Sequence, residues 1–316
     1  MDYKLELSLY HYIFLFILLI IIRYIISFIY QIYYIYQYNK QNKDINDFIY
    51  NKDWDFLDYT KISSYDDYRK EFMNYSFPDN KLREVPLSAW KEKIWLLKWY
   101  EDNGILGPEY IDYTQSDKDI ITKLELDSYC VKPSHLSEMV GVFVVKDNIL
   151  IKTVEYDKIK DVSVPPYFSN FRKGYEISPQ EIYKSMIFLN KVKATWEDNI
   201  RQGCEPGYII EKLREFTEIK IFVLLGKVIA YYYMIGNDFD LSKVFKLAEK
   251  TARASGIDFV RVDIISDDNN NYRVSEFTFN PAISAFRKEL VYFVVKYNFH
   301  KLIKFHNDKK EIKYLL

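Results

Sequence analysis

Residues 259–265 read Phe-Val-Arg-Val-Asp-Ile-Ile and residues 272–279 read Tyr-Arg-Val-Ser-Glu-Phe-Thr-Phe, and these two stretches decide the fold. Both are rich in apolar, β-branched and aromatic residues, which favours β-strands. The six residues between them are all polar, Ser-Asp-Asp-Asn-Asn-Asn, and predict the loop of an antiparallel hairpin. Because both strands are otherwise apolar, the hairpin is expected in a core rather than on the surface.

Two carboxylates are predicted to face each other across this hairpin. If the loop closes symmetrically, Asp263 lies directly opposite Glu276, and Arg261 lies opposite Thr278 on the same face. Like charges that face each other across a strand pair repel, so this pair needs compensation. Mg²⁺ would supply it, because it takes oxygen ligands and keeps water and phosphate in its other positions. The sequence therefore predicts a metal site, with an exposed hairpin carrying incidental acids as the alternative.

The chain around the hairpin mixes strands with helices, which predicts an α+β fold. Ser88 and the capping box at Ser178 each mark the start of a predicted helix. Strands are predicted at residues 129–131, 140–145 and 208–213, a second hairpin at 219–225 and 228–235, and helices from 88 to before Gly104, from 178 to about 202, and at 240–254 before Gly256.

Two lysines lie at positions where a charged side chain needs a partner or a function. Lys132 ends a predicted strand beside Pro133, where it could neutralise phosphate oxygens, although a solvated lysine beside a turn is the more common case. Lys220 interrupts a strand of Ile, Phe, Val and Leu, so it needs a partner or a function. The alternative for Lys220 is an edge strand on which the charge blocks aggregation.

The N-terminal segment is predicted to anchor the chain in a membrane. Nearly every residue from 9 to 36 is apolar or aromatic, with Arg23 as the one charge, and a membrane helix needs about 20 such residues. Tyrosines that follow this run resemble an interfacial belt. A cleaved signal peptide and a buried core helix are the alternatives. We divide the chain into an anchor helix (1–38), a polar stalk (39–85), a catalytic domain (86–290) and a C-terminal helical extension (291–316).

Composition excludes several classes of protein. The 44 basic and 45 acidic residues among 316 give a net charge of -1, so no nucleic-acid partner is expected. The two cysteines, Cys130 and Cys204, are too few for a disulfide framework. Phosphate-loop, dinucleotide and serine-hydrolase motifs are absent, and the four histidines have no zinc-like spacing with cysteine.

Taken in order, five motifs resemble those of the TupA-like ATP-grasp family, which is named for teichuronopeptide synthesis. They are Val-Lys-Pro-Ser-His (131–135), Ile-Ile-Glu-Lys-Leu (209–213), Glu-Ile-Lys-Ile-Phe-Val-Leu-Leu-Gly-Lys (218–227), Val-Arg-Val-Asp (260–263) and Ser-Glu-Phe-Thr-Phe-Asn-Pro (275–281). The resemblance covers about residues 86–287. It implies an ATP-grasp fold, in which two α+β subdomains clasp ATP, and a Mg-ATP-dependent ligase. Such a ligase activates a carboxylate as an acyl-phosphate and passes it to an amine or another nucleophile.

The resemblance also implies roles for single residues. The catalytic groups would be Lys220, beside the triphosphate or substrate, and Arg287, which would meet an anionic substrate. The nucleotide would be held by Lys132 on its α- and β-phosphates, by Glu211, Lys212 and Leu213 around adenine, and by Lys91 or Lys93 as a second lysine; Mg²⁺ would be held by Asp263, Glu276 and Asn280.

The expected partners are ATP, a carboxylate-bearing small molecule or glycan-linked acceptor, and a membrane. ATP is cytosolic, so we expect the catalytic domain on that side of a single-pass anchor, in cell-surface polymer or polysaccharide biosynthesis. Two departures stand against the family pattern. Residues 134–139 contain no glycine for close approach to phosphate, and Thr278 stands where asparagine is usual. A catalytically inactive binding or scaffold module and a membrane-bound glycan transferase are therefore the alternatives.

Overall fold

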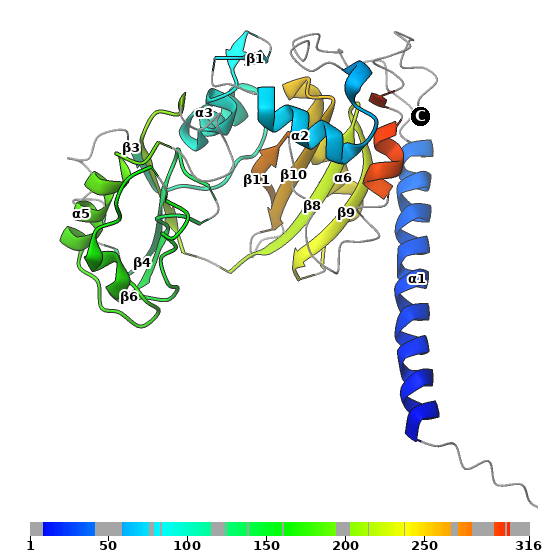
Figure 1. The fold of residues 1–316 in the computed structure, drawn as a ribbon, viewed down its shortest axis with the longest axis horizontal. Helices are drawn as coiled ribbons and strands as arrows, with labels where there is room; N and C mark the ends of the chain where they lie inside the picture. Colours follow the sequence, from blue (N-terminus) through cyan, green and yellow to red (C-terminus); the bar gives the residue numbers. More distant parts are fainter. Residues whose placement is uncertain are drawn as a thin grey trace, which may run out of the picture.

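Two α+β bodies and one projecting helix make up the computed structural model of this protein (Figure 1). The α+β class predicted from the sequence is confirmed. The structure describes residues 9–41, 59–75, 79–82, 84–114, 124, 126–137, 139–159, 161–193, 203–213, 215–236, 238–266, 271–279, 294–300 and 302–303.

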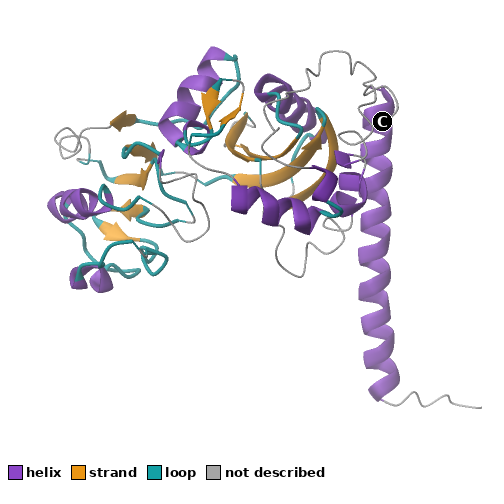
Figure 2. Cartoon of the chain, turned by 45° about the horizontal axis from the view of Figure 1, so that its top comes forward, coloured by secondary structure: helices purple, strands orange, loops and turns teal. Residues whose placement is uncertain are grey.

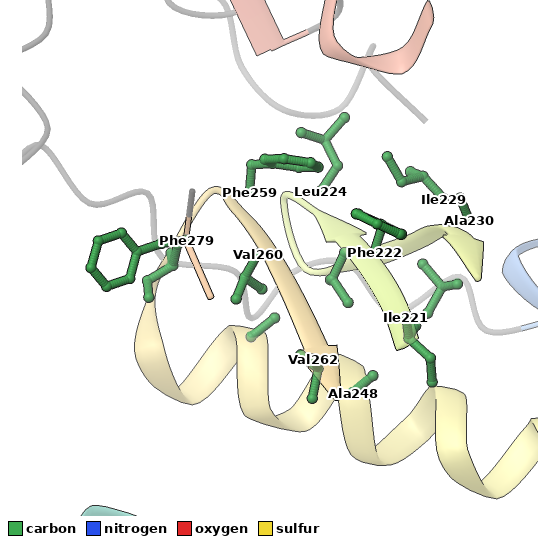
Figure 3. Packing of buried hydrophobic residues seen from close by; sticks show 14 of the residues in the cluster. Ile221, Phe222, Leu224, Ile229, Ala230, Ala248, Phe259, Val260, Val262 and Phe279 are labelled. Atoms are coloured by element: carbon green, nitrogen blue, oxygen red, sulfur yellow. The ribbon is translucent and has the colours of Figure 1, made fainter. Parts of the chain in front are cut away.

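The central sheet is built from the two predicted hairpins, which are confirmed. Its strands are antiparallel in the order β11-β10-β8-β9. Side chains alternate between its faces: Val260 and Val262 point toward helix α6, whereas Phe222 and Phe259 lie on the opposite side (Figure 3). The bounds are β8 (Thr217–Leu224), β9 (Lys227–Ile235), β10 (Phe259–Ser266), β11 (Tyr272–Thr278) and α6 (Leu241–Ser255).

Helix α6 begins and ends as predicted. The side chain of Asp240 accepts hydrogen bonds from the first backbone amides of the helix, which satisfies two of its unpaired donors. Gly256 ends the helix in the left-handed conformation, with φ of +68°, which costs glycine little. The face that carries Val244, Phe245 and Ala248 is buried against the sheet.

The other face of the central sheet is covered by helix α2 (Tyr65–Tyr75). Its Tyr65, Tyr68 and Phe72 are each at most 2% exposed and belong to the same core as the sheet. The prediction of a polar stalk at 39–85 is therefore wrong over this helix. The aromatic residues recur at helical spacing, but the polar residues between them gave the segment the composition of a linker.

The second body contains a five-stranded antiparallel sheet in the order β3-β7-β4-β5-β6. Helix α5 (Pro179–Leu189) packs on it and begins with the predicted capping box, in which Ser178 and Glu181 bond reciprocally. The bounds of the strands are β3 (Asp112–Thr114), β4 (Ser128–Pro133), β5 (Phe143–Lys146), β6 (Ile149–Leu150) and β7 (Tyr208–Lys212).

Two boundaries in this body differ from the prediction. Helix α5 ends at Leu189 rather than near residue 202, because Lys191 and Val192 bond back in tight i−3 turns. Strand β5 starts at Phe143 rather than at residue 140, because Gly141 takes φ of +68° and turns the chain. Residues 194–202 lie outside the described part of the chain.

A helical segment, η3 (Ala89–Lys91) followed by α3 (Lys93–Asp102), connects the two bodies. The predicted cap at Ser88 is wrong, since its backbone is already helical and its side chain makes no capping bond. Glu92 breaks the helix in an extended conformation, and α3 starts after it. The remaining short elements are η2 (Tyr59–Lys61), β1 (Lys81–Leu82), β2 (Val85–Pro86) and η5 (Pro166–Asn170).

Helix α1 (Leu9–Gln41) is long and apolar enough to cross a membrane, and none of its most apolar stretch is buried in the protein. It stands beside the central-sheet body, and much of its length projects beyond it (Figure 2). Its C-terminal end packs on that body: Ile35 and Tyr38 are buried in the same core as α2 and α6. The apolar stretch is therefore not part of the core of this chain.

Candidate functional site

A cavity of about 1020 Å³ lies between the two sheets and under helix α3. Seven lysines and Arg273 line it, against five glutamates, so its wall attracts a multiply charged anion. A cavity of this size, with apolar walls and a few convergent charges, is typical of a ligand site. The basic residues are Lys91, Lys93, Lys132, Lys146, Lys152, Lys212, Lys220 and Arg273; the acidic residues are Glu109, Glu211, Glu215, Glu218 and Glu276.

A transverse row of charged residues crosses the central sheet below this cavity. Asp263 on β10 lies opposite Glu276 on β11, as predicted, although a β-bulge beside Asp263 sets this register, and it lies opposite Lys220 on β8. Directly opposed residues project from the same face of a sheet, so the three side chains share one face. Lys220 and Glu276 line the cavity, whereas Asp263 lies beneath them with its side chain 2% exposed.

Asp263 is held by two cations. The Lys220 Nζ lies 2.5 Å from Oδ2, and Arg261 contacts both carboxylate oxygens, Nε at 2.6 Å from Oδ1 and Nη2 at 2.9 Å from Oδ2. Burial alone would lower the pKa of Lys220, but its pairing with Asp263 raises it above the usual value. Asp263 similarly outweighs burial and raises the pKa of Arg261. Cations of the protein itself therefore already compensate the opposed acids, and a metal held by Asp263 and Glu276 stays a prediction.

The oxygen ligands nevertheless fit Mg²⁺ carried in by a nucleotide. Such a Mg²⁺ takes one or two carboxylates from the protein and its remaining ligands from phosphate and water. Glu276 is exposed to the cavity and stands directly beside Asp263. Among the described residues, no three His, Cys, Asp or Glu side chains gather closely enough to bind a metal by themselves. The geometry therefore fits a metal shared with a ligand rather than a structural metal.

The opposite wall of the cavity carries the predicted nucleotide residues of β4 and β7. Lys132 and Glu211 form an ion pair there. Burial would lower the pKa of Lys132, and the pairing with Glu211 outweighs it, with Glu276 across the cavity adding to the increase. Burial, aided by Glu211, raises the pKa of Cys130 to about 11, so this thiol stays protonated and is not a nucleophile.

Beside this ion pair the cavity offers an apolar surface. Val142 and Val144 from the β5 side and Ile209 and Leu213 from the β7 side line it. Lys212 and Leu213, predicted around the adenine ring, lie at the edge where β7 ends. A flat, uncharged heterocycle fits such a surface, with the phosphates directed toward Lys132 and the row of charges.

The two candidate lysines near α3 have different surroundings. Lys91 lines the cavity and stacks over Phe279, with its Nζ 4.4 Å from the ring centroid. Lys93 donates from Nζ to the backbone carbonyls of Pro133 at 3.2 Å, Ser134 at 3.4 Å and Leu136. Lys93 thus fixes the segment after Lys132, a role that the sequence gave no reason to expect.

The segment that Lys93 holds is the glycine-free stretch after β4. Ser134, His135 and Leu136 are at most 2% exposed, and the His135 Nε2 lies 3.3 Å from the Leu189 carbonyl oxygen. The start of this segment is therefore packed into the second body rather than draped over the cavity. Glu138, which the sequence places at its end, lies outside the described residues.

Two of the predicted site residues cannot be placed. Asn280 and Arg287 lie outside the described residues. In return, the structure adds Arg261, which secures Asp263, and Tyr100, whose ring is buried beside the row of charges. Burial raises the pKa of Tyr100 well above its usual value, and Glu276 and Asp263 raise it further, so its hydroxyl is a neutral group at physiological pH.

The solved structures that the chain resembles are ATP-grasp ligases. PsnB, complexed with a precursor peptide and AMPPNP, is 14% identical, with 62% of this chain and 51% of PsnB covered and a TM-score of 0.35. The D-alanine–D-alanine ligase of Bacillus anthracis is 15% identical, with 77% of each chain covered and a TM-score of 0.43. N5-carboxyaminoimidazole ribonucleotide synthetase of Thermotoga maritima is 13% identical, with 61% and 42% covered and a TM-score of 0.35.

The aligned region spans about half the length of PsnB. No protein-family model matches the sequence, and no curated protein matches it. The function of this chain is therefore inferred from its own side chains.

Proposed function

We propose that this protein is a membrane-anchored ATP-grasp ligase that uses Mg-ATP to activate a carboxylate and transfer it to an amine or another nucleophile. The observation that carries the proposal is the row Glu276–Asp263–Lys220, which faces Lys132 across a net basic cavity. The five sequence motifs that resemble the TupA-like family add support, and they favour an acceptor in a cell-surface polymer or glycan. The apolar helix α1 supplies the membrane anchor, and the site lies on the cytosolic side, where ATP is.

The roles of the residues follow from their positions. Lys132 and Lys220 approach the cavity from opposite walls and neutralise phosphate oxygens, so that charge on a transferred phosphoryl group is stabilised without reorganisation. Arg261 keeps Asp263 ionised and oriented. Mg²⁺, when bound with the nucleotide between Glu276 and Asp263, would neutralise further phosphate charge. Tyr100 and the apolar wall exclude water, which protects an acyl-phosphate from hydrolysis.

A second candidate function is a scaffold that binds nucleotide without turnover. It is favoured by the two ion pairs already made by Asp263, which occupy both of its oxygens. It is also favoured by the packed, glycine-free segment after Lys132, which Lys93 fixes in place. This candidate shares the binding site with the ligase and differs only in the absence of ADP release.

Nucleotide titration of the full-length protein in detergent or nanodiscs tests the proposal. We expect ATP to bind with Mg²⁺ and to lose that Mg²⁺ dependence in Glu276→Gln, an exposed position where the substitution leaves the fold intact. Glu155→Gln, an exposed position that is not part of the cavity lining, is the matched control and retains binding. Absence of nucleotide binding by the folded wild type would refute both functions. Binding without ADP release from any carboxylate–amine pair would favour the scaffold.

A further inference from the structure

Helix α1 meets the rest of the protein along one stripe only. Its exposure falls at Phe28, Gln31, Ile35 and Tyr38, spaced three or four residues apart, and at the two neighbours of Tyr38. Every residue from 10 to 27 is exposed. Eighteen helical residues extend about 27 Å, close to the roughly 30 Å hydrocarbon core of a bilayer. If α1 spans the membrane, as the proposed function holds, the protein body begins where the bilayer ends.

Contacts along α1 show which end of the body lies there. The Asn39 side chain donates to the Val228 carbonyl at the start of β9, at 2.9 Å. Further back along the helix, Tyr34 packs edge-on against Phe245, with ring centroids 5.9 Å apart, and Phe245 in turn contacts Tyr231. Moving toward the N-terminus of α1 therefore means moving toward the C-terminal end of β9, so the two elements run antiparallel.

The end of β9 reaches the level at which α1 leaves the body. Val228 and Ile235 are seven residues apart, which is about 23 Å of strand or about 15 residues of helix. Counted along α1 from Asn39 toward the N-terminus, this distance ends near Tyr24 to Phe28. In Figure 1 the far ends of β8 and β9 lie at about the level of the middle of α1.

This end of the central sheet carries apolar side chains that are open to solvent. Phe216, Met234 and Ile235 are 41%, 46% and 45% exposed, and Phe216 also borders the cavity. They lie together, because Glu218 pairs with Ile235 and Gly236 abuts Thr217. Behind them, Phe239 stacks between Tyr233 and Tyr272, with ring centroids 5.9 and 6.0 Å apart. Exposed aliphatic groups backed by tyrosines are typical of proteins at a membrane–water interface.

We propose that this end of the sheet, formed by Phe216, Met234 and Ile235, is a second membrane contact that dips into the bilayer surface beside α1. Its partner is lipid itself rather than anionic headgroups. The nearby Glu215, Asp238 and Asp240 are acidic and repel such headgroups, and the one described cation beside them, Lys243, is paired with Asp240. The contact is therefore expected on phosphatidylcholine and is insensitive to salt. Arg23, which lies within the spanning stretch, reaches this same interface by extending its side chain.

Accessibility of nitroxide labels in the full-length protein tests the contact. Single cysteines replace Met234, Ile235, Ile149 or Leu19 in a Cys130→Ser, Cys204→Ser background, and the proteins are assembled in phosphatidylcholine nanodiscs. Ile149, 43% exposed on the second body, is the matched control for exposure, and Leu19 reports the span itself. We expect oxygen, which partitions into lipid, to reach positions 19, 234 and 235 several-fold better, relative to a water-soluble nickel chelate, than position 149.

The accessibilities at the labelled positions distinguish the second membrane contact from the membrane anchor. Lipid accessibility at position 19 together with water accessibility at 234 and 235 would overturn the second contact and leave the anchor standing. Water accessibility at position 19 would overturn the anchor and the contact together, without bearing on nucleotide binding. A pattern at 234 and 235 that vanishes in 1 M salt would overturn the apolar character of the contact, because screening reaches about 3 Å at that concentration.

Discussion

Lys220 on β8 and Asp263 on β10 lie directly opposite each other, with Nζ and Oδ2 2.5 Å apart and side chains 14% and 2% exposed. Arg261, two residues before Asp263 on the same strand, contacts the same carboxylate from the side. The carboxylate thus has two positive neighbours, and its acidic neighbour Glu276 can stay next to it without a strong repulsion. The charges of Lys220, Arg261, Asp263 and Glu276 therefore balance one another before any ligand arrives.

The Lys220–Asp263 pair should be strongly coupled in stability. Asp263→Asn removes the buried anion shared by Arg261 and Lys220, which leaves Lys220 only its pair with Glu218, and should cost about 3–5 kcal/mol. Lys220→Met leaves Arg261 in place and should cost less. Thermal unfolding of both variants and the double variant in detergent gives the coupling energy, expected at about 1–3 kcal/mol. Lys146→Met, an exposed lysine lining the same cavity, is the control and should change little. Additive single effects would refute the coupling.

Lys93 should stabilise the segment after Lys132 more than its surface location implies. Removing its ammonium in Lys93→Met takes this donor from the carbonyls of Pro133 and Leu136, while the Ser134 carbonyl keeps its bond from the Lys93 backbone amide. We expect a cost of about 1–3 kcal/mol. Hydrogen exchange of the amides of residues 134–137 should accelerate in this variant. Lys98→Met, on the exposed side of the same helix, is the matched control. Equal exchange in the two variants would show that Lys93 does not fix the segment.

Glu92 should make stability depend on pH. Burial raises its pKa to about 7, with Glu205 adding to the increase. Between pH 4.5 and 7 the folded state holds a proton that the unfolded state has lost, so stability falls as pH rises through this window and levels off above it. Glu92→Gln cannot ionise, and its stability relative to wild type should improve by about 2–3 kcal/mol between pH 4.5 and 7.5.

Unfolding temperatures of Glu92→Gln, wild type and Glu101→Gln at three pH values check this prediction. Glu101 is an exposed glutamate on the same helix, so its variant should follow the wild type. Parallel curves for Glu92→Gln and wild type would mean that Glu92 is ionised throughout in the folded protein.

Gly141 should tolerate no side chain, for a reason beyond its backbone conformation. A Cβ there would lie 2.6 Å from the Leu189 Cδ1 atom and 3.2 Å from the Pro133 Cγ atom, next to the glycine-free segment. Gly174 also has a positive φ, but a Cβ there meets nothing within 4 Å. Both alanine variants incur the conformational cost, so Gly141→Ala should be less stable than Gly174→Ala by the overpacking cost, about 1–3 kcal/mol. Equal unfolding temperatures would contradict this.

The pairing of β10 with β11 could be predicted because it is a local property. The predicted opposition of Asp263 and Glu276 is confirmed, but a β-bulge between Asp263 and Ile264 produces it. Nearer the loop Ile264 pairs with Val274, so an unbroken register would place Ser275 opposite Asp263. The cations around Asp263 could not be predicted in the same way. Lys220 is 43 residues away, and only the strand order β10-β8 brings it opposite Asp263. Charge compensation across a sheet depends on topology, which a single hairpin does not reveal.

Two further features could not be predicted from the sequence, because they too depend on contacts between distant parts of the chain. Helix α2 was concealed because burial of Tyr65, Tyr68 and Phe72 depends on a sheet that forms from residues far later in the chain. The role of Lys93 was concealed because its three acceptors are backbone carbonyls, which leave no mark in a sequence. The strands, hairpins and capping box were predicted correctly because their signals lie within a few residues of each other.

Because Ile35 and Tyr38 fasten α1 to the central-sheet body, that body cannot rotate independently of α1. The five-stranded body joins it through the segments around α3 and the short crossing between β7 and β8, and it makes no extensive contact with α1 among the elements described. Any change in the width of the cavity must therefore come from movement of the five-stranded body relative to the central-sheet body. If α1 spans a membrane, as proposed, the row of charges stays at a constant height over the lipid, and acceptors are limited to those that can reach that height from the membrane.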